Sequence, residues 1–162
     1  MKQELDKLLC ERYPKMMVNR NKTAQETCMC WGFSCGDGWY NILNQLMSNI
    51  QHHIDWKQEQ KEKYNRGEGC TQVTLDQVKE KFGTLRFYYT GGDDEIRGMV
   101  RMAESMSGVI CEECGSPGTQ TQTVGLKLHV THIEGKVNEQ QRIFPTIQYQ
   151  LETRVPKLVF FC

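Results

Sequence analysis

Apolar residues recur along the chain at two spacings, and each spacing predicts one kind of element. Near the start they recur every three or four positions, which predicts a short amphipathic helix over residues 2–12, stopped by Pro14. The apolar positions of this series are Leu5, Leu8, Leu9 and Tyr13. Residues 15–36 have no clear period, and we expect an irregular segment there.

A second helical series predicts the main helix, over residues 37–58. Asp37 opens it and is a good N-cap residue. The apolar stripe that should form a wall of the core consists of Trp39, Leu43, Leu46, Ile50 and Ile54. We expect the polar run that follows to become a solvated loop.

Residues 72–90 are rich in valine, threonine, phenylalanine and tyrosine, which favours a β-hairpin. Leu85, Phe87 and Tyr89 alternate and should lie on one face of its second strand. In the first half, Thr74 and Gln77 could instead cap a single turn of helix. Both interpretations stand for that half.

A third helix is predicted over residues 93–107, with Asp93 or Asp94 as its cap and Gly108 at its end. Its inward positions would be Ile96, Val100, Ala103 and Met106. Capping explains both aspartates without a role in metal binding or in acid–base chemistry.

The segment that follows carries four residues with the spacing of a zinc site. Cys111 and Cys114 are separated by two residues, and Gly115 gives the backbone room to fold over an ion. Fourteen residues later, His129 and His132 form a second pair with the same gap. The pattern is close to recognised zinc spacings.

The approach to the histidines alternates like a strand, which favours two opposed knuckles over a zinc-finger helix. On a straight strand His129 and His132 would face opposite sides, so we expect a turn between Val130 and His132. Four protein ligands leave no open position, which predicts a structural Zn2+ rather than a catalytic one. The alternative is two buried thiols and two surface histidines.

Together these elements predict an α+β fold, with two main helices packed on a small antiparallel sheet. We divide it into a core (residues 1–108), a zinc-knuckle or zinc-ribbon element (109–132) and C-terminal strands (133–162) that complete the same domain. The alternating residues that predict the C-terminal strands are Ile147, Tyr149, Leu151 and Val155.

Charge and cysteine content narrow the classes of function. Lysine and arginine balance aspartate and glutamate at 20 each, so there is no electrostatic reason to expect tight binding to nucleic acid or to an anionic membrane. The N-terminus has no apolar core of signal-peptide length, and no stretch approaches about 20 apolar residues, so we expect a cytoplasmic protein. In a reducing cytosol, the eight cysteines favour metal ligation or free thiols over disulfides.

Three stretches, CGDGWYNIL, QVKEKFGTLRFYYTGGDDEI and AESMSGVICEECGSPG, resemble a group of small proteins of unassigned function from bacteria, prophages and tailed phages. The likeness runs from about Cys10 to His132. In that group a second pair, similar to the other half of a zinc knuckle, follows the CxxC. The resemblance places His129 where the group often has cysteine, and His132 at the other ligand position. It implies a phage or prophage setting and a bound metal, but no catalytic mechanism.

Three further thiols lie close together, at Cys28, Cys30 and Cys35. They could bind a second metal together with another cysteine, but free thiols in a reducing compartment are favoured. The cysteines that could join them are Cys10, Cys70 and Cys162.

His52, His53 and Asp55 together invite a catalytic interpretation. On the helix, however, His53 lies at the edge of the buried stripe and His52 points elsewhere. A boundary residue and a solvated residue are therefore favoured over a catalytic pair.

Lys79, Lys81 and Arg86 could form a basic strip on the hairpin, with Phe87 and Tyr88 close by. Such a mixture can bind a nucleotide or single-stranded nucleic acid through charge and stacking. The same alternation is also typical of a sheet with one wet and one buried face, and Glu80 dilutes the charge.

No nucleophile–base pair or open metal position can be identified, so we assign no catalytic residue and do not favour an enzyme. We expect a non-catalytic, zinc-binding accessory protein of a phage or prophage. It would act in the host cytoplasm by binding a host protein or a small-molecule defence signal. The alternative is a nucleic-acid-binding zinc-ribbon protein.

Overall fold

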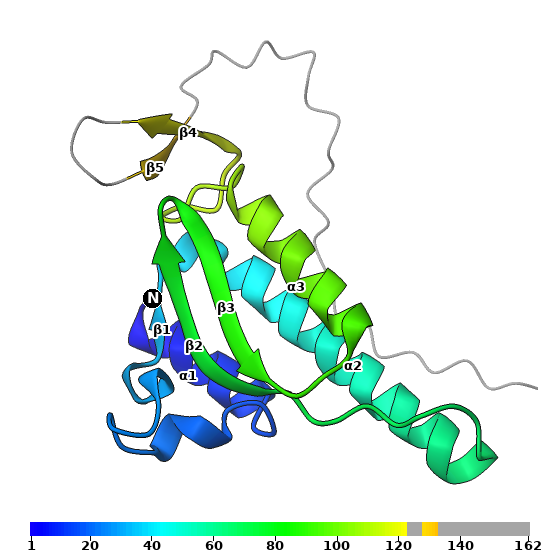
Figure 1. The fold of residues 1–162 in the computed structure, drawn as a ribbon. Coiled ribbons are helices and arrows are strands. Elements are labelled where there is room, and N and C mark those ends of the chain that lie inside the picture. Colours follow the sequence, from blue (N-terminus) through cyan, green and yellow to red (C-terminus); the bar gives the residue numbers. More distant parts are fainter. Residues whose placement is uncertain (123–127, 133–162) are drawn as a thin grey trace, which may run out of the picture.

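The computed structural model describes residues 1–122 and 128–132, with side chains through residue 118. Within these residues three α-helices accompany a small sheet, which confirms the predicted α+β class (Figure 1). The helices are α1 (Gln3–Arg12), α2 (Tyr40–Tyr64) and α3 (Asp94–Ser107), with 3-10 helices η1 (Val18–Asn21), η2 (Cys28–Trp31) and η3 (Asp37–Trp39). The strands are β1 (Phe33–Ser34), β2 (Thr74–Lys81), β3 (Thr84–Thr90), β4 (Gly118–Gln122) and β5 (Leu128–His132).

The main sheet has the strand order β1-β2-β3, and β4 pairs with β5 in a separate hairpin. β2 and β3 form the predicted hairpin, with Val78 opposite Phe87, so the alternative of a helical turn at Thr74 is wrong. β1 pairs with β2 in parallel through Phe33 and Val78, which makes the sheet mixed rather than antiparallel. The sequence did not reveal β1, because a strand of two residues shows no alternation.

α2 provides the wall of the core that its apolar stripe predicted. The stripe residues are each 5 % exposed or less: Trp39, Leu43, Leu46, Ile50 and Ile54. Asp37 is not the N-cap of this helix, because it opens η3 and its carboxylate accepts the Lys2 N–H at 2.7 Å. The carboxylate therefore ties the start of the chain to the start of α2.

The polar run after residue 58 is helical as far as Tyr64, contrary to the predicted loop. This run consists of good helix formers and has pairs one turn apart, such as Lys63 and Glu59 at 2.7 Å. Asn65 then ends the helix in a left-handed conformation, with φ of +50°.

α3 has the predicted bounds, with Gly108 as its C-cap. Ile96, Val100 and Ala103 are buried as predicted, but Met106 is 45 % exposed. Ser107 occupies the buried position at this end of the helix instead. Met106 lies in a groove between α2 and α3 rather than in the core.

The outer edge of β3 is covered by side chains of α3. Ser107 Oγ accepts the Leu85 N–H at 2.8 Å, and Glu104 Oε1 accepts the Phe87 N–H at 3.0 Å. These bonds satisfy donors that an edge strand would otherwise present to water or to another chain. Leu85 and Phe87 point their side chains into the core, and Tyr89 is half-buried, as predicted.

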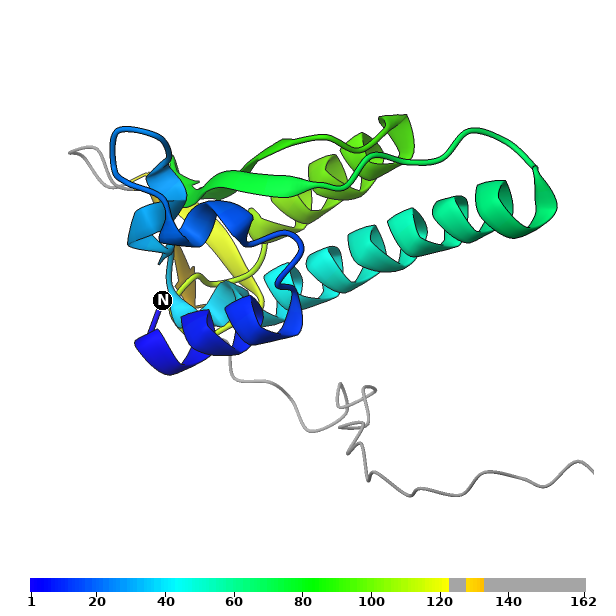
Figure 2. The ribbon, with the colours of Figure 1, turned by 90° about the horizontal axis from the view of Figure 1, so that it is seen from below.

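α1 lies beside the first turns of α2 (Figure 2). The buried Tyr13, just after α1, donates its hydroxyl to Asn44 O of α2 at 2.9 Å. Leu8 is 44 % exposed, so it does not belong to the buried side of α1. Asp6 is buried there and accepts the Phe33 N–H of β1 at 3.3 Å.

Two further expectations concern membrane spans and the C-terminal strands. None of the helices in the described residues is long and apolar enough to cross a membrane. The predicted C-terminal strands fall within residues 133–162, which lie outside the described residues.

Candidate metal centre

Cys111 and Cys114 lie on a tight turn after α3, as their spacing predicted. The Cys111 N–H donates to Ser116 O at 2.8 Å, and the Gly115 N–H donates to Cys111 O at 2.9 Å. Gly115 has φ of +76°, a left-handed conformation that favours glycine. The backbone thus forms the kind of turn from which two sulfurs can approach one ion.

This cysteine turn rests on residues 36–39, which are distant in the sequence. The Gly38 N–H donates to Glu112 O at 2.7 Å, and the Gly36 N–H donates to Glu112 Oε1 at 2.7 Å. The Trp39 indole Nε1 donates to Ile110 O at 2.9 Å. The segment leading into α2 and the cysteine turn therefore form one packed unit.

The two thiols of the turn differ in exposure and in acidity. Cys111 is buried and Cys114 is exposed. Hydrogen bonds from Ser116 and from Cys111 lower the pKa of the Cys114 thiol. Because the thiolate is the form that binds metal, this environment favours Cys114 as a ligand.

The two histidines predicted to complete the site lie on β5. His132 is opposite Gly118 of β4 and His129 is opposite Thr121, in a regular register. The turn predicted between Val130 and His132 is wrong, because the ladder continues through both residues. At about 3.3 Å per residue, the two histidine backbones lie about 10 Å apart along the strand. The side chains of β5 lie outside the described part, and the four-ligand zinc site stays a prediction.

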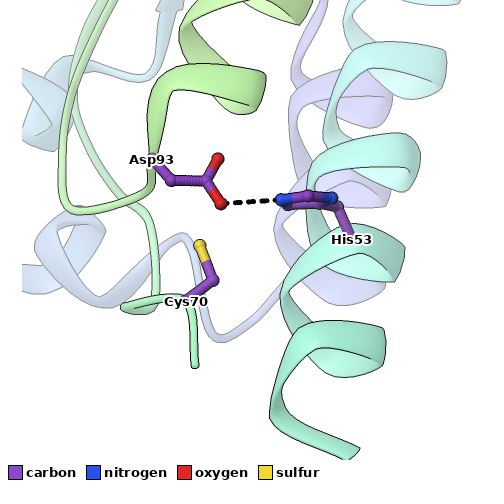
Figure 3. Close-up of side chains that lie close together, drawn as sticks. All are labelled: His53, Cys70 and Asp93. Atoms are coloured by element: carbon purple, nitrogen blue, oxygen red, sulfur yellow. Dashed lines mark hydrogen bonds and ion pairs between the residues drawn. The ribbon is translucent and has the colours of Figure 1, made fainter. Parts of the chain in front are cut away.

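A second group of potential ligands comes from three separate segments (Figure 3). His53 belongs to α2, Cys70 to the loop before β2, and Asp93 immediately precedes α3. Their ligand atoms all lie within 4.8 Å of one another. Among the side chains that the structure describes, this is the one group of three or more such residues within reach of a common ion.

Asp93 makes two contacts at this centre, one with each of its carboxylate oxygens. Oδ2 lies 2.8 Å from His53 Nε2, and the His53 side chain is only 8 % exposed. Oδ1 accepts the Ile96 N–H at 3.0 Å, which confirms Asp93 as the N-cap of α3. One carboxylate therefore caps α3 and joins it to α2.

The environment of the centre shifts the pKa values of Asp93 and Cys70 in opposite directions. Burial raises the pKa of Asp93, but hydrogen bonds from His53 and from the Ile96 N–H outweigh it and lower the pKa to about 2. Burial, followed by the charge of Asp93, raises the pKa of the Cys70 thiol to about 11. At neutral pH a carboxylate thus lies beside a protonated thiol. A bound cation would stabilise the Cys70 thiolate and displace its proton.

A second layer of charge surrounds these three residues. Glu95 Oε2 lies 3.5 Å from His53 Nδ1, on the other side of the ring from Asp93. Lys57 Nζ lies 2.9 Å from Glu95 Oε1 and 3.8 Å from Asp93 Oδ2. A carboxylate next to the outer nitrogen of a ligating histidine fixes the orientation of its ring, and Glu95 is placed for that task.

The donor set of the centre suits Zn2+, which binds imidazole nitrogen, thiolate sulfur and carboxylate oxygen. In a tetrahedral site with bonds of about 2.1 Å, neighbouring ligand atoms lie about 3.4 Å apart. The hydrogen bond between His53 Nε2 and Asp93 Oδ2 is shorter, at 2.8 Å. An ion would replace this bond, and the two atoms would need to move apart by less than about 1 Å. Three protein ligands would leave one position of the tetrahedron open.

The positions of two members of this centre were predicted from the sequence, but their proximity was not. It placed His53 at the edge of the buried stripe and Asp93 at the helix cap, and both placements are confirmed. Cys70 stood in a polar loop with no pattern around it. Only the packing of α2 against α3 brings the three segments together.

The cysteines near η2 do not form a comparable group within the described side chains. Cys30 Sγ donates to Thr27 O at 3.2 Å, and Cys10 Sγ donates to Asp6 Oδ1 at 3.3 Å. Burial raises the pKa of Cys35 to about 12, which keeps that thiol protonated. The favoured interpretation of these cysteines as free thiols stays a prediction.

The residues predicted as a basic strip lie on β2 and β3. Lys79 is directly opposite Arg86, and Lys79 Nζ lies 5.5 Å from the centre of the Tyr88 ring. Lys81 and Tyr88 are exposed, and the other two are half-buried. The hairpin thus brings all four residues to one side of the sheet, away from the core.

No protein-family model, curated protein or solved structure matches this chain. The chemistry of the residues themselves is therefore the basis on which a function can be assigned.

Proposed function

We propose that this protein binds a divalent transition-metal ion at His53, Cys70 and Asp93, and that the ion is Zn2+. The observation that carries the proposal is the approach of three different ligand atoms, from three segments, to within 4.8 Å. Imidazole and thiolate together favour Zn2+ over Mg2+ or Ca2+, which prefer oxygen ligands.

An ion at this centre would act on both structure and binding. It would tie the loop that carries Cys70 to α2 and to the start of α3, because each ligand comes from a different segment. The open fourth position would accept water or a donor group of a small ligand. The four-ligand site at Cys111, Cys114, His129 and His132 remains our proposal for a second, structural Zn2+.

Metal binding at the proposed centre can be separated from the cysteine turn by mutation. The double variant Cys111→Ser/Cys114→Ser should retain one bound ion per chain, because the ligands of the centre are intact. Adding Cys70→Ser should weaken Zn2+ binding by at least about 100-fold, since it removes a ligand. Competition with a chromophoric chelator measures the affinity, and the thiolate absorption of bound Co2+ reports the cysteine ligand.

Two further variants serve as controls for this experiment. Cys30→Ser removes a thiol that bonds only to Thr27 O in the described part, and it should leave the affinity unchanged. Asp93→Asn keeps a good N-cap for α3 but removes the charged oxygen, so it should weaken binding without loss of helix. Equal affinity in the Cys70→Ser and Cys30→Ser proteins would contradict the proposed centre, as would a double variant without any ion.

We also propose a wider role as an accessory protein of a phage or prophage. It would act by binding a host protein or a small-molecule defence signal. Support for this role comes from the three stretches that resemble phage and prophage proteins, and from an ion position open to a small ligand.

Expression of the protein in cells that carry a host defence system tests this role. We expect phage plating to increase, and the Cys70→Ser variant to lose the increase if the signal binds at the ion. Unchanged plating across several defence systems, together with no captured host protein or small molecule, would contradict the accessory role and leave metal binding to be judged by its own measurement.

A further inference from the structure

The β2–β3 hairpin lies over α2 and α3 (Figure 1). Its outer side carries a regular set of polar and aromatic residues. Alternate residues of the same strands, such as Val78, Leu85 and Phe87, are buried on the inner side. The outward residues form three cross-strand pairs, which are Gln77 with Tyr88, Lys79 with Arg86, and Lys81 with Thr84. We call these residues, together with Phe82 of the turn, the hairpin strip.

The hairpin strip concentrates positive charge that is not paired with an acidic side chain among the described residues. Lys79 and Arg86 are directly opposite each other, an arrangement in which like charges destabilise a sheet. None of the ion pairs among the described side chains includes Lys79, Lys81 or Arg86. The neighbouring Glu80 uses Oε1 to accept the Gly83 N–H at 2.6 Å. A bound anion would remove the repulsion between the two opposed cations.

Two aromatic rings lie exposed at the two ends of the hairpin strip. Tyr88 is 43 % exposed and Phe82 is 58 % exposed. Phe82 also has φ of +55°, an unfavourable conformation for a bulky residue, and the turn gains no burial of its ring in return. Each ring has a lysine beside it, with Lys79 Nζ 5.5 Å from the Tyr88 centroid and Lys81 Nζ 5.4 Å from the Phe82 centroid.

We propose that the hairpin strip binds single-stranded nucleic acid. Exposed rings offer stacking surfaces for unpaired bases, and the cations between them offer contacts for phosphates. The two rings are separated by about five residues of strand, or about 17 Å, which is the length of a few nucleotides. A duplex hides the faces of its bases, and a simple anion has no use for the rings, so neither explains both features.

The region beyond Tyr88 limits where the phosphates of a bound strand can lie. Tyr88 borders a hollow of about 350 Å³ that is also lined by Glu26, Thr27, Cys28, Asp76 and Gln77. The two carboxylates in this hollow repel phosphate, so the phosphates should follow Lys79, Lys81 and Arg86 instead. The hollow can accept the edge of a base stacked on Tyr88. This role is independent of the metal centre, whose residues lie on α2, on the loop before β2 and before α3.

Binding of the intact protein to a fluorescent twelve-nucleotide oligo(dT) tests the proposal. Measured by anisotropy, log Kd against log salt concentration should have a slope of about 2 in magnitude, from three phosphate contacts on a single strand. Tyr88→Ala should weaken binding by about 5- to 150-fold, whereas Tyr88→Phe keeps the ring and should bind as the parent does. Lys79→Gln should reduce the salt slope by about 0.7.

Lys63→Gln is the matched control for Lys79→Gln, because it removes the same charge from an exposed lysine of α2 outside the hairpin strip. Far-ultraviolet circular dichroism confirms that each variant is folded. The proposal is overturned if the parent does not bind the oligonucleotide at low salt. It is also overturned if Lys63→Gln weakens binding as much as Lys79→Gln, or if a duplex of the same length binds as tightly as the single strand.

Discussion

Replacement of Trp39 by alanine is expected to lower the free energy of unfolding by about 3–5 kcal/mol. The Trp39 side chain is fully buried, so its removal leaves a large cavity at the start of α2. The substitution also removes the indole N–H that donates to Ile110 O at 2.9 Å and leaves that carbonyl without this partner. A loss of this size is a large part of the total stability of a typical domain, which is about 5–15 kcal/mol.

Urea unfolding followed by circular dichroism measures the effect, with Trp56→Ala as the control. Trp56 is 49 % exposed on α2, so its replacement should cost less than about 1 kcal/mol. Similar losses in the two variants would show that Trp39 does not hold the cysteine turn on the core in the way described.

Gly38→Ala is expected to destabilise the protein by about 3 kcal/mol, although it adds only one methyl group. A Cβ at this position would lie 2.3 Å from Cys111 O and 2.3 Å from Gly115 N. Both are backbone atoms of the cysteine turn, so they cannot rotate away as the end of a flexible side chain could. The turn must shift, and the bond from the Gly38 N–H to Glu112 O is then lost or lengthened.

Gly98→Ala provides a control with the opposite expected sign. Gly98 is exposed on α3, and a Cβ there would meet nothing within 4 Å. Because glycine is a poor residue in a helix interior, this variant should be more stable by about 0.5–1 kcal/mol. If thermal unfolding shows that both alanine variants are equally well tolerated, the close contact at Gly38 is wrong.

The sequence predicted those parts of the fold that depend on a repeated local pattern. The stripe of α2, with Leu43 and Ile50 fully buried, follows from helical spacing alone. The hairpin follows from alternation, as Leu85 and Phe87 show. β1 was not predictable, because its parallel pairing depends on contacts between distant segments rather than on its own two residues.

The two candidate sites also differ in whether the local sequence predicted them. The turn at Cys111 and Cys114 was predictable, since two cysteines and a following glycine determine it locally. The group at His53, Cys70 and Asp93 was not, because each member has an ordinary local explanation or none. Helix capping accounted for Asp93, and a boundary position accounted for His53, so nothing in either pattern indicated their contact at 2.8 Å.

The contact between residues 36–39 and the cysteine turn has a consequence for where the folding unit ends. A fragment that stopped at residue 108 would retain all of α1, α2 and α3. It would still lose the acceptors for the Gly38 N–H and the Trp39 indole, and it would open the largest buried side chain to water. Truncation designs that aim for a minimal stable protein should therefore extend at least through Gly118, whose N–H donates to Val109 O at 2.9 Å.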